Sequence, residues 1–192
     1  MRGCLSDDRF AAVGAYGDDL HGDARLPLDE LHVAFERLGE LLVAAVPAQV
    51  AFPALELGVE LADLLINKNK CTDSNYAAQY NLPGTFAPIA DYELLESAVN
   101  TVREKGLTVR AGNVLTSDVF YNDDPTVNDR WRKMGVLAVE MEAAALYMNA
   151  ARAGKKALCM LTISDHLYKD EKLSARERQL GFDNMIQIAL DM

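Results

Sequence analysis

Between Cys71 and the C-terminus, the pattern of hydrophobic and polar residues switches repeatedly from strand-like to helix-like. Short apolar runs, which are typical of buried strands, occur at 107–111, 136–139 and 157–163, and a further run at 114–120 continues into a loop. Helical spacing of apolar residues marks 91–105 and the Ala-rich stretch after Glu142, and each is followed by a glycine that stops a helix. Strands that alternate with helices predict an α/β fold with a mixed or parallel sheet.

The last predicted helix carries a clear start signal. Ser174 and Glu177 have the spacing of a capping box, in which each side chain satisfies the other residue's backbone N–H group. This helix is predicted to run to about Leu190. A polar turn at 122–125 precedes a shorter helix that ends at about Met134 and contains the only tryptophan.

The first 66 residues differ in composition from the rest of the chain. They contain no Lys, Asn or Thr, and their single Ile is the last residue. A helix is predicted from Pro27 to about Val46, because proline suits a first turn and apolar residues then recur on one face. The stretch 56–66 fits a short helix or a strand. We therefore divide the chain into an atypical N-terminal segment, 1–66, and a main part, 67–192; such a break is typical of a domain boundary, a fusion or a shifted reading frame.

Two carboxylates lie where the predicted strand 136–139 ends and the Ala-rich helix begins. Glu140 and Glu142 flank Met141 at this point. The carboxyl ends of strands in α/β sheets open into the crevice where ligands bind. A carboxylate there also suits the positive N-terminus of a helix, and this structural role fits one of the two acids well. A functional role for the pair is equally open.

A second polar group follows the predicted strand 157–163. If this strand neighbours the strand before Glu140, both strand ends present acids to one crevice. Asp165 could then act as a general acid, provided that its surroundings raise its pKa. Taken alone, Ser164 and Asp165 are better explained as turn-forming residues, and Arg178 as a solvent-exposed basic residue in the last helix.

Composition narrows the class of partner. The formal net charge of −10 at pH 7 argues against nucleic acid and anionic membranes, which bind basic surfaces. No apolar run has the length of a membrane span and the N-terminus lacks the layout of a signal peptide, so a cytoplasmic location is expected. The three cysteines and three histidines lie far apart, which predicts neither a disulfide framework nor a metal site.

Seven segments between Cys71 and Asp191 occur in the same order in one known family of enzymes. They are Cys71-Thr72-Asp73-Ser74, Phe86-Ala87-Pro88-Ile89-Ala90-Asp91, Gly112-Asn113-Val114, Ser117-Asp118-Val119-Phe120-Tyr121, Val139-Glu140-Met141-Glu142-Ala143-Ala144, Ile163-Ser164-Asp165-His166 and Glu177-Arg178-Gln179. By these motifs the chain resembles the bacterial, high-molecular-mass type of purine nucleoside phosphorylase, in the nucleoside phosphorylase superfamily. The resemblance covers about 71–191, and the N-terminal segment does not share it.

The resemblance implies a fold and a reaction. The fold is a layered α/β/α arrangement with a mixed central sheet, here incomplete at the N-terminus. The reaction is the phosphorolysis of purine ribo- and deoxyribonucleosides, in which phosphate attacks the anomeric carbon and the free purine leaves. Phosphate is a co-substrate and no further cofactor is implied. The family assembles as rings of dimers, commonly hexamers, which implies a homo-oligomer.

The resemblance also implies roles for three residues in the chemistry. Asp165 is similar to the acid that protonates N7 of the purine and so makes the base a better leaving group. Arg178 is similar to the residue that engages this aspartate and promotes proton transfer, and Ser164 lies beside them at the base.

Five further residues match those that bind the nucleoside in the family. Phe120 packs against the base in this alignment, and Val139 and Glu140 line its pocket. Met141 and Glu142 hold the ribose, and the Glu142 carboxylate accepts hydrogen bonds from the sugar hydroxyls. A carboxylate near the sugar also suits the positive charge that develops on it in the transition state.

The residues that bind phosphate in the family have no counterpart in this chain. Counting back from Cys71, the family's Arg-to-Ser phosphate segment falls on Ala48-Gln49-Val50-Ala51, which offers no positive charge. No phosphate-binding residue is therefore identified. Two alternatives stay open beside an impaired phosphorylase: a nucleosidase that uses water in place of phosphate, and an inactive nucleoside-binding or assembly subunit.

Overall fold

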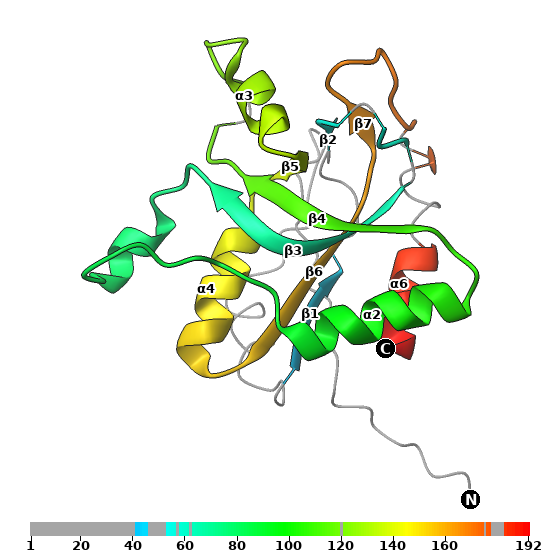
Figure 1. Ribbon diagram of the computed structural model, residues 1–192, viewed down its shortest axis with the longest axis horizontal. Helices are drawn as coiled ribbons and strands as arrows, with labels where there is room; N and C mark the ends of the chain where they lie inside the picture. The colour runs from blue at the N-terminus through cyan, green and yellow to red at the C-terminus, as the bar shows by residue number, and fades with distance from the viewer. Residues whose placement is uncertain are drawn as a thin grey trace, which may run out of the picture.

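A mixed β-sheet forms the centre of the molecule, with helices on both faces (Figure 1). This computed structural model describes residues 41–45, 53–56, 58–61, 63–119, 121–174, 176–177 and 183–192. Within these ranges, seven strands are ordered β1-β6-β3-β4-β5-β2-β7 across the sheet. Their bounds are β1 Leu41–Ala45, β2 Pro53–Ala54, β3 Leu64–Thr72, β4 Val109–Thr116, β5 Val136–Glu140, β6 Lys156–Thr162 and β7 Asp165–His166.

The sheet combines a parallel centre with antiparallel neighbours. β3, β4 and β5 run parallel to one another, so their carboxyl ends lie at the same end of the sheet. β6 runs antiparallel to β3, while β2 is antiparallel to β5 and parallel to β7. Only Ile163 and Ser164 separate β6 from β7. Because two residues span so short a distance, the sheet must curve until its β7 edge approaches the end of β6.

Two layers of helices cover the sheet, which confirms the predicted α/β/α layering. The bounds are η1 Tyr76–Tyr80, α2 Tyr92–Glu104, α3 Val127–Lys133, α4 Ala143–Ala153 and α6 Asp183–Asp191. α4 packs on the face that presents Leu65, whereas α2 and α6 pack together on the face that presents Leu64 and Ile66. Successive residues of β3 thus alternate between the two cores, as a strand buried on both faces requires.

The helix boundaries around the main elements follow the sequence signals. Asp91 caps α2, because its carboxylate accepts a hydrogen bond from the Leu94 backbone N–H at 3.1 Å. α2 ends before Gly106 and α4 before Gly154, and the backbone φ angles of these glycines are +67° and +64°. Glycine reaches this left-handed region without steric penalty, so the two stop signals act where they were predicted.

The capping box predicted before the last helix is present. The backbone N–H of Ser174 donates to the Glu177 carboxylate at 2.8 Å, and the Glu177 N–H donates to Ser174 Oγ at 3.2 Å. Residues 176–177 are helical, and helix α6 ends one residue beyond the predicted Leu190. The intervening part of the predicted helix, 178–182, lies outside the described residues.

The predicted helix from Pro27 to Val46 is wrong at its C-terminal end. Residues 41–45 form β1, which pairs in parallel with β6 from Leu41 opposite Lys156 onward. A continuous apolar run of five residues is compatible with a helix or a strand. Here it forms a strand, because the edge of β6 offers backbone hydrogen-bonding groups with which it pairs. The rest of that predicted helix lies outside the described residues.

β3 resolves the ambiguous stretch 56–66 and extends well beyond it. The strand begins at Leu64 and continues through the polar run 67–70 to Thr72. The polar residues of this run lack the apolar pattern of a buried strand, so this part of β3 was not predicted, although Asn67 is fully buried. Similarly, β4 joins the two apolar runs that were predicted as separate stretches, because both halves pair with β3.

A buried tyrosine hydroxyl ties α4 to the sheet. Tyr147 Oη donates to the backbone oxygen of Asn67 at 2.9 Å and accepts from the Cys159 N–H at 3.0 Å. Burial raises the pKa of Tyr147 well above its ordinary value, so the hydroxyl keeps its proton.

Replacement of Tyr147 by phenylalanine is expected to lower the free energy of unfolding by about 2 kcal/mol, because buried backbone partners lose a hydrogen bond. Urea denaturation followed by tryptophan fluorescence measures this loss. The matched control is Tyr92→Phe, since the exposed Tyr92 hydroxyl donates only to the Glu96 side chain in the same helix. Equal stability of Tyr147→Phe and the wild type would contradict the structural role of this hydroxyl.

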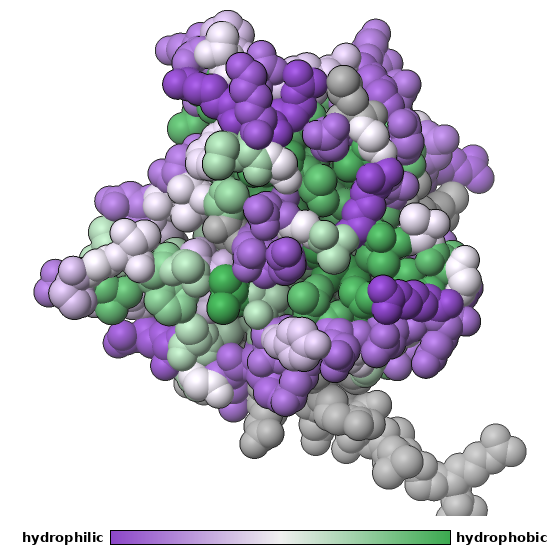
Figure 2. All heavy atoms as spheres, viewed as in Figure 1, coloured by the Kyte–Doolittle hydropathy of each residue, from purple (hydrophilic) through white to green (hydrophobic). Residues whose placement is uncertain are grey.

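The surface is divided by polarity. In Figure 2 the end of the molecule that carries α3 is strongly hydrophilic, whereas hydrophobic residues reach the surface over the strands above α2. Among the helices that the structure describes, none combines the length and apolar character of a membrane span.

Candidate active site

A cavity of about 140 Å³ opens at the carboxyl ends of β4 and β5. It is lined by Pro53, Leu115, Ser117, Val119, Tyr121, Asn122, Val127, Asn128, Val139, Glu140, Met141 and Leu167. We call this cavity the strand-end pocket. Its walls come from the end of β5, the loop after β4, the first turn of α3 and the segment after β7. Three of the predicted nucleoside-binding residues, Val139, Glu140 and Met141, therefore border one cavity.

Asp165, in β7, is placed near this region because β7 pairs with β2, which in turn pairs with β5. Pro53 pairs with Asp165 on one side, and the antiparallel register of Ala54 with Ala138 sets Pro53 opposite Val139 on the other. Residues in register on neighbouring strands point to the same face of a sheet. Two strand spacings separate Asp165 from Val139, which corresponds to about 10 Å between their backbones. The proposed proton donor and the proposed base-binding residue thus share one face.

The expectation that the strands before Glu140 and Asp165 are neighbours is wrong. β6 runs antiparallel to β3, and its last residue Thr162 lies beside the start of β3, at the opposite end from Glu140. Asp165 is brought back by β7, which pairs with β2 beside β5. The curvature of the sheet, which the pattern of apolar runs does not report, produces this return.

The Glu140 carboxylate is engaged at the N-terminus of α4. It accepts hydrogen bonds from the backbone N–H groups of Glu142 at 2.8 Å and Ala143 at 2.6 Å, and from the Thr116 hydroxyl. Thr116 Oγ1 in turn accepts from the Ala144 N–H at 3.0 Å. Glu140 is 1% exposed. The side chains of Glu140 and Thr116 therefore accept hydrogen bonds from three of the backbone N–H groups that the start of a helix leaves without partners. Glu140 thus has the structural role that the sequence suggested for one of the two acids.

Glu142 occupies a different environment. It is the residue before α4 and is half-buried, and its carboxylate accepts a hydrogen bond from the Met141 N–H at 3.3 Å. No side-chain hydrogen bond of Glu142 caps α4. Of the two acids, Glu142 is accordingly the one whose carboxylate is not bound to the amides of the helix start.

A short hairpin holds Asp165. Ser164 and Leu173 are joined by a backbone hydrogen bond of 2.8 Å, and His166 N–H donates to the Glu171 carbonyl at 3.1 Å. The buried Ser164 hydroxyl donates to Asp165 Oδ2 at 2.8 Å. The backbone and the neighbouring hydroxyl thus fix the direction of the Asp165 carboxylate, which stays half-buried.

The tip of this hairpin is tied to α3. Tyr168 Oη donates to Asp129 at 2.7 Å, and the Arg132 guanidinium carbon lies 4.5 Å from the centre of the Tyr168 ring. Partial desolvation of the hydroxyl, followed by the hydrogen bond to the Asp129 carboxylate, raises the pKa of Tyr168 to about 12. The phenol is therefore neutral at physiological pH and donates, which links two walls of the strand-end pocket.

Two predicted site residues, Phe120 and Arg178, lie outside the described residues. Others were missed: the pocket-lining residues Pro53, Asn122, Asn128 and Leu167 carried no local signal of a binding role. Ser117 could have been found, because it directly follows the end of β4, as Met141 follows the end of β5.

The charge of the pocket lining bears on the choice of ligand. None of the described residues that line the strand-end pocket is a lysine or an arginine. Over the parts of the chain that are described, no group of three or more His, Cys, Asp and Glu side chains could hold a metal ion. The lining combines apolar side chains, such as Leu115 and Val127, with the polar side chains of Ser117, Asn122 and Asn128, which suits a ligand with an apolar ring and polar edges.

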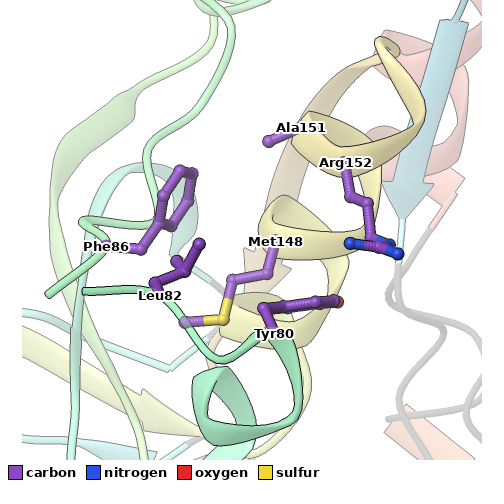
Figure 3. A pocket seen from close by; sticks show the side chains of 6 residues that line it. All are labelled: Tyr80, Leu82, Phe86, Met148, Ala151 and Arg152. Carbon is purple, nitrogen blue, oxygen red and sulfur yellow. The ribbon is translucent and has the colours of Figure 1, made fainter. Parts of the chain in front are cut away.

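A second hollow, of about 220 Å³, lies between the segment after η1 and the C-terminal half of α4 (Figure 3). Phe86 and Leu82 face Met148 across it, and Arg152 extends beside the Tyr80 ring, 5.4 Å from its centre. This hollow contains none of the motif residues that end β5 and β6, and it is almost entirely apolar.

Comparison with known proteins agrees with this architecture. The profile of the Phosphorylase superfamily matches residues 54–188, a stretch that begins inside the N-terminal segment. Proteins named purine nucleoside phosphorylase DeoD-type from Bacillus cereus (strain ATCC 14579) and Bacillus thuringiensis (strain Al Hakam) are each 47% identical over 139 residues. These matches cover 72% of this chain and 59% of each relative, so the chain spans about three fifths of their length.

A solved structure shares the fold. The purine nucleoside phosphorylase of Toxoplasma gondii, crystallised with immucillin-H, superposes with a TM-score of 0.72 over 84% of this chain and 66% of that one. The sequence identity is 15%, so this likeness concerns the fold alone. The profile match over most of the chain shows the family: the chain belongs to the Phosphorylase superfamily.

Proposed function

We propose that this chain binds a purine nucleoside in the strand-end pocket and carries the base-side chemistry of a purine nucleoside phosphorylase. One observation carries the proposal: Val139 and Met141 line the same cavity as Ser117 and the residues that follow it. Asp165 lies on the same sheet face as Val139, because both are in register with Pro53 of β2. The 47% identity to proteins named purine nucleoside phosphorylase supports the choice of ligand.

In this proposal, one group of residues binds the purine base and a second group binds the ribose. Val139 and Phe120 contact the purine ring, which is apolar on both faces. Met141 and Glu142 hold the ribose, and the Glu142 carboxylate accepts hydrogen bonds from its hydroxyls. This assignment is supported by the contrast between the two acids, because the Glu140 carboxylate is already bound to the start of α4.

The reaction breaks the bond between the anomeric carbon and N9 of the base. A phosphate oxygen forms the new bond to that carbon, and the electron pair of the broken bond goes to the purine. Asp165 gives its proton to N7, so the base leaves without a full negative charge. Arg178 engages Asp165 during this transfer, and Ser164 keeps the carboxylate oriented toward the base.

The phosphate site is not assigned to any residue of this chain. The described pocket lining lacks lysine and arginine, and about two fifths of the length of each relative lies outside the match. The two alternatives from the sequence, a nucleosidase in which water replaces phosphate and a subunit that binds nucleoside without turnover, are distinguished from the phosphorylase by the following experiment.

Release of free purine from inosine and from adenosine, each with and without inorganic phosphate, tests the proposal. Release that requires phosphate supports the phosphorylase, and release without phosphate supports the nucleosidase. The matched control is a mock purification from the same host without this chain, because any activity that it shows comes from a contaminating enzyme. Absence of release and of hypoxanthine binding by the folded wild type would contradict both candidates.

We further propose a homo-oligomer, in line with the assembly that the resemblance implies. Light scattering of the purified chain measures its molar mass directly. A monomer at micromolar concentration would contradict this part of the proposal and leave the nucleoside site unaffected.

A further inference from the structure

A carboxylate outside the pocket holds the loop that forms one of its walls. Asp73 follows β3 directly and belongs to a motif, Cys71-Thr72-Asp73-Ser74, to which no role has been assigned above. Asp73 Oδ2 accepts a hydrogen bond from Ser117 Oγ at 2.9 Å, and Oδ1 accepts from the Asp118 N–H at 3.1 Å. One side chain therefore binds two successive residues of the loop after β4.

The hydrogen bonds continue into the loop. The Val119 N–H donates to Ser117 Oγ at 3.2 Å, so the hydroxyl accepts from the loop while it donates to Asp73. The Val119 carbonyl, 3.1 Å from Ser117 Oγ, competes for the same proton. The charged carboxylate is the stronger acceptor, which favours the connected chain from Val119 through Ser117 to Asp73.

Packing alone restrains this loop weakly. Val119 and Tyr121 line the strand-end pocket, yet they are 50% and 87% exposed. Ser117, in contrast, is 5% exposed, and its N–H donates to the Glu140 carbonyl at 2.9 Å. The buried start of the loop is thus fixed by β5 and Asp73, and the exposed part that follows depends on how that start is held.

We propose that Asp73 is a positioning residue, which sets the height of the Ser117–Tyr121 loop over the purine ring. This inference rests on the proposed function, because the loop carries Phe120, which is assigned to the base, and its residues Val119 and Tyr121 line the strand-end pocket. Asp73 itself is not among the residues that line the strand-end pocket. Its loss should therefore weaken binding of the base and leave the chemical step close to its normal rate.

Three variants and one control test this role. Asp73→Ala removes both acceptors, and Ser117→Ala removes the central hydroxyl. Asp73→Asn keeps an acceptor for the Asp118 N–H, and its amide can donate to Ser117 Oγ once the hydroxyl turns toward the Val119 carbonyl. The control is Asp91→Ala, which removes a carboxylate that accepts a backbone N–H at the start of α2, away from the pocket.

The measurements are KM and kcat for inosine, the Kd for hypoxanthine, and hydrogen exchange of the amides of the Ser117 loop. Asp73→Ala and Ser117→Ala should raise KM or Kd roughly fivefold, which corresponds to the loss of one hydrogen bond to a partly exposed charge. kcat should change less than twofold, exchange at Val119 should accelerate, and Asp73→Asn should restore most of the affinity.

The outcomes separate this inference from the proposed function. If the wild type binds hypoxanthine and Asp73→Ala binds it as tightly as Asp91→Ala does, the positioning role is wrong and the proposed function stands. If Asp73→Ala and Asp91→Ala lost hypoxanthine affinity equally, the loss would reflect lower overall stability, and the positioning role of Asp73 would again be wrong. If the wild type binds no purine, the proposed function is wrong, and the role of Asp73 is overturned with it.

Discussion

Asp165→Asn is expected to reduce purine release by a factor of roughly 10² to 10⁴, the range that a positioned general acid contributes. Asparagine has nearly the same shape and still accepts a hydrogen bond from Ser164 Oγ, so the hairpin that holds it should be preserved. It carries no proton that N7 of a purine can take. Binding of hypoxanthine should therefore change far less than the rate of release from inosine, measured in the presence of phosphate.

Two controls make this result specific. Asp170→Asn alters an exposed aspartate in the same hairpin and should leave the rate unchanged. A nucleoside whose N7 is methylated already carries the positive charge that protonation supplies, so Asp165→Asn should release its base at close to the wild-type rate. Equal losses for inosine and the N7-methylated nucleoside would contradict proton donation and indicate a binding role for Asp165.

Glu140→Ala is expected to lower the free energy of unfolding by about 3 kcal/mol, because three donors at a buried helix start lose their acceptor. For a chain of this size, such a loss corresponds to a fall in Tm of roughly 6–12 °C. The Thr116 hydroxyl and the amides of Glu142 and Ala143 are the groups left without that partner. Thermal unfolding followed by the fluorescence of Trp131, the only tryptophan, measures the change.

Glu142→Ala is the matched comparison, two residues along the same segment. Its carboxylate does not cap α4, so the free energy of unfolding should fall by about 1 kcal/mol or less. Loss of the ribose contact should instead raise KM for inosine by roughly tenfold. If Glu140→Ala kept its stability, or if Glu142→Ala were the less stable of the two, the division between a structural and a ligand-binding acid would be wrong.

Local signals in the sequence located most elements of the main part of the chain. Asp91, Gly106 and Gly154 mark helix ends because capping and left-handed backbone depend on single residues. The capping box of Ser174 and Glu177 has the predicted bonds for the same reason. These features involve residues three or four positions apart, so no tertiary information is needed to predict them.

Pattern analysis failed where pairing partners decide the structure. Leu41–Ala45 was predicted as the end of a helix and is a strand, because an apolar run of five residues takes the form that its neighbour offers. The polar run 67–70 was not predicted as a strand, although it continues β3 alongside β4. In both cases hydrogen bonds to residues far away in the sequence set the conformation.

The sequence by itself determined the α/β alternation, the helix ends and the two acidic segments that follow strands. Only the tertiary structure decided that β7 pairs with β2 and so places Asp165 on the same sheet face as Val139, since curvature of the sheet is a property of all its strands together. It also decided which acid is structural. Glu140 and Glu142 look alike in the sequence, but only the Glu140 carboxylate reaches the free N–H groups of α4 and the Thr116 hydroxyl. The direction of a side chain beside a helix start depends on the backbone that surrounds it, and the residue pattern does not encode that direction.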